Sequence, residues 1–70
     1  MNNIDVRSYI VNNFKDDSVE EIQKSIDSSI ESRSDDPLIG LGVLFEVLWN
    51  TSNEEMRNSI LSNIKKGLTG

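Results

Sequence analysis

The sequence of 70 residues contains no cysteine and no histidine. Without cysteine no disulfide bond can form, and without either residue a structural zinc site has none of its usual ligands. A single core in so small a domain rarely supplies more than roughly 3–5 kcal/mol. Stability must therefore come from efficient packing or from self-association, and a cysteine-free chain is typical of the reducing interior of a cell.

Residue patterns that would support catalysis are also missing. The serine side chains have no histidine that could act as a base. Paired carboxylates, which could in principle hold a hard cation, occur at Asp16-Asp17, Glu20-Glu21, Asp35-Asp36 and Glu54-Glu55. Each pair lies at an expected helix start, where the helix dipole favours negative charge. We therefore predict that the chain is not an enzyme and has no catalytic, cofactor-binding or metal site.

Positive charge is in the minority. The sequence has seven lysine and arginine residues and twelve acidic residues, which gives a net charge of −5 at pH 7. The basic residues are spread along the chain. Because binding to duplex DNA depends on gathered positive charge, DNA is not expected as a partner. Below about pH 4 the carboxylates become protonated, so the chain turns into a polycation that should dissolve in acid.

Only one proline is present, and no segment alternates in the way that predicts a half-buried strand. Instead, four segments repeat apolar residues every three or four positions and predict helices. These helices are expected over about 4–14, 18–30, 37–50 and 52–67. Their expected N-terminal caps are Asn3, Ser18, Asp36 and Ser52, and Gly67 is expected to end the last helix in a left-handed conformation. The predicted fold class is all-α, a small four-helix bundle that forms a single domain over 1–70.

The third segment, "PLIGLGVLFEVLWN", is apolar on nearly every side. Such a helix is normally surrounded by protein or lipid, and this one is too short, with Glu46 inside it, to cross a bilayer. We predict a central third helix with Phe45 and Trp49 as core anchors, largely buried by the other three helices. Glu46 is expected to lie at the bundle edge or to pair with Arg7 or another base. The alternative is a specialised role for a buried carboxylate with a raised pKa.

Two glycines stand in the first turns of this helix. Gly40 and Gly42 each cost about 1 kcal/mol relative to alanine. They indicate either a close approach by another backbone or a regular helix that begins only at Leu41. Three amphipathic neighbours would leave part of the helix uncovered, which predicts a twofold homodimer, with a monomeric bundle as the alternative. The residues expected at the dimer contact are Ile39, Gly40, Val43 and Val47.

The run "GLGVLFEVLW" at residues 40–49 resembles the small acid-soluble spore protein I family, a minor spore protein family of endospore-forming bacteria. Similar spacing is found in "VRSYIVNN" at 6–13, "SIDSSIES" at 25–32 and "ILSNIKKGL" at 60–68. The chain departs from the family pattern at Pro37, which stands three positions before Gly40 instead of directly before the Gly-Leu-Gly unit. It also has Tyr9 and Ser29 where members commonly carry alanine.

The resemblance implies a protein of the forespore and the dormant spore core, on the cytoplasmic side, with no enzymatic activity assigned to the family. We therefore expect a non-catalytic protein that acts through contacts with itself or with an unknown spore protein, and no membrane partner. The alternative is a DNA-associated protein that protects or organises the spore chromosome. The chain lacks the glycine-rich segments of the DNA-coating acid-soluble spore proteins, and a shared extraction property is weak support for a shared mechanism.

Overall fold

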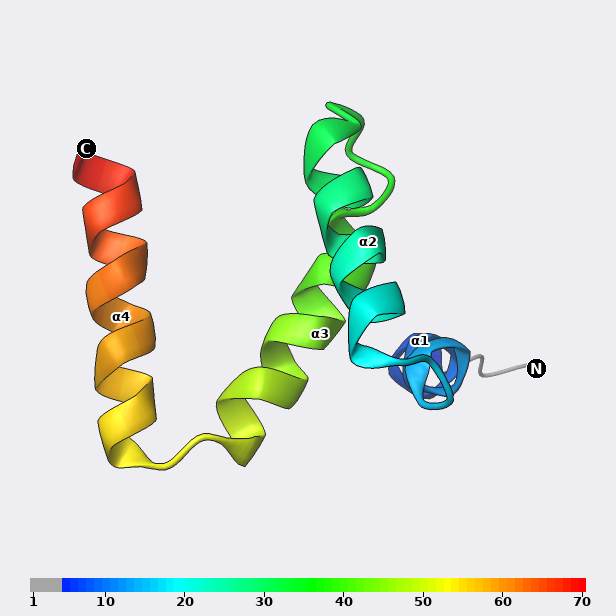
Figure 1. Cartoon of the computed structure of the whole chain (residues 1–70), viewed down its shortest axis with the longest axis horizontal. Helices are drawn as coiled ribbons and strands as arrows, with labels where there is room; N and C mark the ends of the chain where they lie inside the picture. Colours follow the sequence, from blue (N-terminus) through cyan, green and yellow to red (C-terminus); the bar gives the residue numbers. More distant parts are fainter. Residues whose placement is uncertain (1–4) are drawn as a thin grey trace.

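The computed structural model describes residues 5–70, which form four helices and no strand. The helices are α1 (Val6–Phe14), α2 (Val19–Glu31), α3 (Leu38–Thr51) and α4 (Glu54–Thr69) (Figure 1). The prediction of an all-α fold built from four helices is confirmed. The expected contributions of Asn3 and Ile4 lie outside the described residues.

The first two helices begin at side chains that satisfy free backbone N–H groups. The side chain of Asp5, the residue before α1, accepts a hydrogen bond from the backbone N–H of Ser8 at 3.3 Å. At α2 the predicted capping box is confirmed, because the N–H of Glu21 donates to Ser18 Oγ at 3.1 Å and the N–H of Ser18 donates to Glu21 Oε1 at 2.8 Å. Both devices are local, and therefore α1 and α2 begin where short-range chemistry places them.

The starts of the other two helices differ from the prediction by one residue. Pro37, and not Asp36, occupies the cap position of α3, and it makes no side-chain capping bond. The backbone N–H of Asp36 instead donates to Ser34 Oγ at 3.1 Å, within the connection after α2. At α4 the cap is Asn53 and not Ser52, because Asn53 Oδ1 accepts from the N–H of Met56 at 2.8 Å.

Ser52 has a different role from the predicted one. Its side chain is buried, and its Oγ donates to the carbonyl oxygen of Leu48, so it closes the end of α3. The prediction for Gly67 was also wrong. α4 continues through this residue to Thr69, and no glycine among the described residues has a positive φ. The helix continues because the N–H of Gly70 still reaches the carbonyl oxygen of Lys66 at 2.8 Å.

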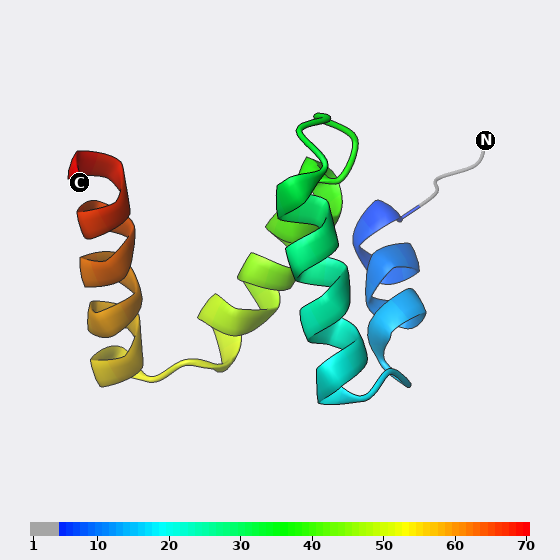
Figure 2. The ribbon, with the colours of Figure 1, turned by 45° about the horizontal axis from the view of Figure 1, so that its top comes forward.

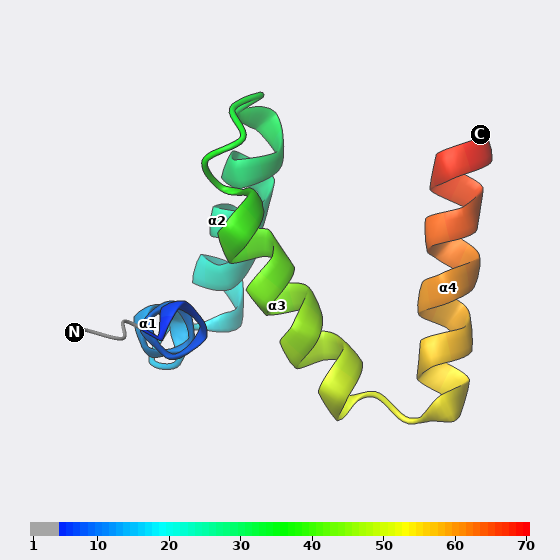
Figure 3. The same ribbon diagram turned by 180° about the vertical axis from the view of Figure 1, so that it is seen from behind.

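α3 packs against α1 and α2 but is not covered by α4. Figures 1 and 2 show α1 and α2 beside α3, and Figure 3 shows from behind that α4 stands apart beyond a short link. Val43 is the one buried apolar residue found among residues 5–70, with 7% of its surface exposed. The expectation that three helices enclose α3 was wrong. α3 and α4 meet at the short link of Ser52 and Asn53, which we call the vertex, and from there α4 diverges from α3 (Figure 1).

Candidate interaction surface

The residues expected to mediate self-association do not form one exposed surface. Val43 is buried, and it lies near Val6 and Arg7 of α1. Val47 faces α1 and α2, where it borders a shallow groove with Phe14 and Ile22. Of the other two residues, Ile39 remains 62% exposed and Gly40 is half-buried. This side of α3 is thus buried by the protein's own helices at Val43, whereas Ile39 and Val47 (43% exposed) remain accessible.

Neither explanation of the two glycines fits the described structure. A Cβ atom built on Gly40 or Gly42 would meet nothing within 4 Å, so no other backbone approaches closely. The helix also begins at Leu38, before both glycines, and not at Leu41. The two positions therefore leave open space beside the first turns of α3.

Phe45 and Trp49 lie on the opposite side of α3 and are less buried than expected. Phe45 is 40% exposed and Trp49 is half-buried. Their rings stack with centroids 5.9 Å apart and planes inclined by 28°. The prediction of large burial does not hold for Phe45, because α4, which should have covered it, stands apart. The pair forms an aromatic surface instead of the centre of a core.

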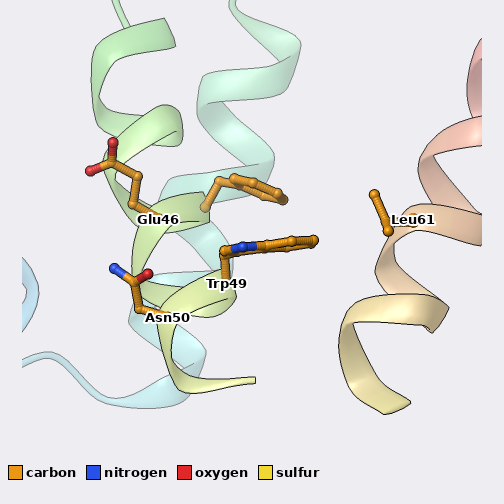
Figure 4. Close-up of a pocket in the computed structure, with 5 residues that line it drawn as sticks. Glu46, Trp49, Asn50 and Leu61 are labelled. Atoms are coloured by element: carbon orange, nitrogen blue, oxygen red, sulfur yellow. The ribbon is translucent and has the colours of Figure 1, made fainter. Parts of the chain in front are cut away.

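This aromatic surface forms one wall of a groove between α3 and α4. The groove measures about 270 Å³ and is lined by Phe45, Glu46, Trp49 and Asn50 of α3 and by Leu61 of α4. In Figure 4 the ring of Trp49 extends towards Leu61, whereas Glu46 and Asn50 point away from α4. The groove is therefore open and mainly apolar, which suits binding to another apolar surface better than it suits chemistry.

Further exposed apolar side chains lie along both helices beyond the groove. On α3, Leu38 lies seven residues before Phe45 and thus on the same side of the helix. On α4, one side of the helix carries Leu61, Ile64 and Leu68, which are 51%, 42% and 79% exposed, respectively. We call the whole set the α3–α4 face, and it consists of Leu38, Phe45, Trp49, Leu61, Ile64 and Leu68. Exposed apolar surface of this kind, gathered on two neighbouring helices, marks interaction sites in soluble proteins.

Arg57 holds α3 and α4 together at the vertex, and this contact was not predicted from the sequence. Its guanidinium lies 4.9 Å from the centroid of the Trp49 ring, and its Nε donates to the carbonyl oxygen of Trp49 at 3.0 Å. A signal was available, because Arg57 lies on the apolar side of the predicted fourth helix among Met56, Ile60 and Ile64. A cation on an apolar side indicates a specific partner, and the lone tryptophan is a suitable one.

Glu46 is paired with Arg7, as one of the two interpretations predicted. Arg7 Nε lies 2.7 Å from Glu46 Oε1, and Arg7 Nη2 lies 2.9 Å from Glu46 Oε2, so the pair is bidentate and ties α1 to α3. Hydrogen bonding from Arg7 holds the pKa of Glu46 below its usual value. Because the pair is largely exposed, its contribution is that of a surface clamp and not of a buried reactive carboxylate.

Two negative findings concern residues 5–70. No three potential metal-ligating side chains come together there. In the same range no helix has both the length and the apolar character needed to span a membrane.

Comparisons with known proteins give one consistent family. The family model for small, acid-soluble spore protein I matches residues 4–68. Proteins of that name are similar to this chain in Bacillus cytotoxicus (33% identity, covering 94% of both chains) and in Halalkalibacterium halodurans (35% identity, covering 94% of this chain and 97% of the relative). A third, from Shouchella clausii, is 36% identical over 90% of this chain and 91% of the relative. No solved structure matches. The resemblance noted in residues 40–49 is thereby confirmed, and the chain belongs to the small, acid-soluble spore protein I family.

Proposed function

We propose that this spore protein is non-catalytic and acts in the forespore and dormant spore core by binding protein through the α3–α4 face. The observation that carries the proposal is the open groove beside Phe45, Trp49 and Leu61. An aromatic pair stacked in the open, with aliphatic side chains opposite, presents apolar area that a protein partner can remove from water. Removal of such area from water is the main favourable contribution to most protein association.

The charges near the groove are consistent with a protein partner. Glu46 is bound to Arg7 on the side of α3 away from α4, and Arg57 is stacked on Trp49. A partner that covers the α3–α4 face would therefore not have to bury an unpaired carboxylate, which would be costly. Aromatic residues and arginine are also the residue types that most often dominate binding energy at interfaces.

Association with DNA is the alternative, and the placement of the basic residues does not favour it. Arg57 is engaged with Trp49, which leaves Lys65 and Lys66 as the adjacent cations of α4, on a helix that starts with Glu54 and Glu55. With so few phosphate contacts, binding to random duplex DNA should be weaker than the usual non-specific range of roughly 10⁻⁴–10⁻⁶ M at physiological salt. Fluorescence anisotropy tests this expectation. Micromolar affinity that falls steeply with added salt would favour the DNA function instead.

Site-specific photocrosslinking in spores tests the proposed surface. A benzophenone amino acid placed at Leu61 should give defined protein adducts, because Leu61 lines the groove. The matched control is Ser62, which is exposed and lies about 100° further around α4. Adducts from Leu61 but not from Ser62 support the proposal. Adducts to DNA, no adducts, or equal yields from both positions would contradict it.

A further inference from the structure

We propose that the partner at the α3–α4 face is a second copy of this chain, with α4 of each copy packed against α3 of the other. This inference rests on the proposed function, since it names the occupant of the same surface. It differs from the dimer expected from the sequence, which used the Ile39 and Val43 side of α3. On that side Val43 is already buried by the chain itself, whereas Ile39 and Val47 remain exposed.

The exposed area of the single chain supports a second copy. The chain exposes 5964 Å², whereas a compact monomer of its mass, 7.9 kDa, is expected to expose about 4,400 Å². The excess is larger than the roughly 800 Å² that each partner buries in an interface of standard size. A dimer that removed this excess from both chains would bury about 3,100 Å² in total, which lies within the range of obligate homodimer interfaces, from about 2,000 Å² upwards.

The dimensions of the chain agree with its exposed area. The radius of gyration is 13.8 Å, whereas a compact domain of this length has a value of about 11 Å. Figures 1 and 3 show the cause, because α4 stands away from the three packed helices and no other segment of residues 5–70 fills the angle between α3 and α4. The space beside the apolar side of α4 is therefore available to another molecule.

Contacts at the vertex explain why the chain does not fill this space with its own α4. Arg57 is held to Trp49 both by stacking and by the hydrogen bond from its Nε to the Trp49 carbonyl oxygen. Ser52 is buried and bonded to Leu48, and Asn53 caps α4 at once. Both residues of the link thus make hydrogen bonds, Ser52 to α3 and Asn53 to α4. Closing α4 onto its own α3 would require these hydrogen bonds and the contact of Arg57 with Trp49 to break.

A second copy, related by a twofold axis, would cover the exposed apolar sides of both α3 and α4. The exposed side of α3 carries Leu38, Phe45 and Trp49, and the exposed side of α4 carries Leu61, Ile64 and Leu68. In an isologous dimer each contact occurs twice, so α3 of one copy meets α4 of the other and the reverse contact follows by symmetry. A heterologous partner would have to supply a matching pair of apolar surfaces, whereas this chain already contains both.

Sedimentation velocity over a range of concentrations tests the dimer. The wild-type chain should sediment with twice the monomer mass, and Leu61→Asp should raise the dissociation constant about tenfold or more because it places a charge in the apolar contact. Ser62→Asp is the matched control and should leave the dissociation constant unchanged. Circular dichroism should show the same helix content in both variants, since both positions are exposed. A monomer at all concentrations, or equal effects of the two variants, would overturn the inference.

Crosslinking between mixed chains tests the exchanged arrangement, and the absence of native cysteine makes it specific. A chain with Phe45→Cys is mixed with a chain with Leu61→Cys and treated with a short bis-maleimide. The yield of linked heterodimer should be several times that obtained with a Ser62→Cys chain. A double variant Phe45→Cys/Leu61→Cys that links only within one chain would show that α4 closes on its own α3, and would overturn the inference.

The two proposals can fail separately. If the purified chain stays monomeric while the photoreactive residue at position 61 captures a different spore protein, the proposal of a second copy is wrong and the proposed function stands. If neither sedimentation nor photocrosslinking detects a protein at the α3–α4 face, both are wrong.

Discussion

The two sides of α3 use similar side chains for different purposes. On one side Val43 is buried near α1, and Arg7 and Glu46 bind each other across the two helices. On the other side Phe45 and Trp49 stack on each other, and Arg57 of α4 lies over the Trp49 ring. Large apolar side chains thus occur on both sides, valine on one and the two aromatic residues on the other, but the one buried among them is Val43. An apolar helix indicates how much surface must be covered and does not indicate which molecule covers it.

The largest expected effect concerns the covered side. Val43→Asp should lower the free energy of unfolding by about 3–5 kcal/mol, because it leaves an unpaired charge in a buried position. Since a core of this size rarely supplies more than that, α1, α2 and α3 should separate. Urea denaturation followed by circular dichroism measures the change. Val47→Asp is the control, and its effect should be smaller because Val47 is 43% exposed; equal effects would mean that Val43 is not the centre of the packing.

A smaller effect is expected where α4 begins. Because α4 has little tertiary support, its first turn depends on its own cap, and Asn53→Ala should cost about 1 kcal/mol. Ser52→Ala is the matched variant and should weaken the end of α3, since Ser52 donates to Leu48. Hydrogen exchange of the amides in the first turn of α4 distinguishes the two. Loss of protection there in Ser52→Ala, but not in Asn53→Ala, would show that the sequence-based assignment of the cap was right after all.

Arg57→Lys tests what holds the vertex. Lysine keeps the charge but lacks the Nε hydrogen bond and the planar stacking, so the vertex should lose about 0.5–1 kcal/mol. Emission from Trp49, the single tryptophan, should shift to longer wavelength as its ring becomes more exposed to water. Helix content should not change. An unaltered emission spectrum would mean that the arginine does not restrain the ring in solution.

The smallest effect concerns the exposed clamp between α1 and α3. The pKa of Glu46 is lowered in the folded chain by its hydrogen bonds to Arg7. The unfolded chain therefore takes up the proton first as the pH falls. The stabilisation from this pair should be fully present above the unfolded pKa of Glu46 and should disappear as the pH falls through the folded value. Urea midpoints measured across this range should depend less on pH in Glu46→Gln than in the wild type; identical slopes would show that the pair makes no contribution.

Features set by neighbouring residues were predictable from the sequence. The Ser18 and Glu21 capping box needs only a spacing of three residues, and the number and type of helices follow from apolar periodicity. The partner of Glu46 was also foreseeable, since Arg7 was one of few bases that could reach it. Membership of the spore protein family was evident from residues 40–49 and is confirmed over residues 4–68.

Features that depend on a choice between equivalent side chains, or on contacts between helices, were not predictable. Ser52 and Asn53 are both good caps, and the choice between them was decided by the bond from Ser52 to Leu48. Val43 was expected at a dimer contact and Phe45 in the core, whereas Val43 is buried and Phe45 is exposed; both are apolar, and local pattern does not distinguish them. The angle of α4 depends on Arg57 and Trp49, which are eight residues apart in two different helices.

The separation of α4 from the packed helices also has a consequence for folding kinetics. Most contacts in this chain lie within single helices, and the few between distant residues join α1 and α2 to α3. Such local topologies fold in microseconds to milliseconds. Arg57 closes the vertex across only two linking residues, so it adds little delay. If two chains then exchange α4, refolding should show a fast phase independent of protein concentration, followed by a slower phase whose rate increases with concentration.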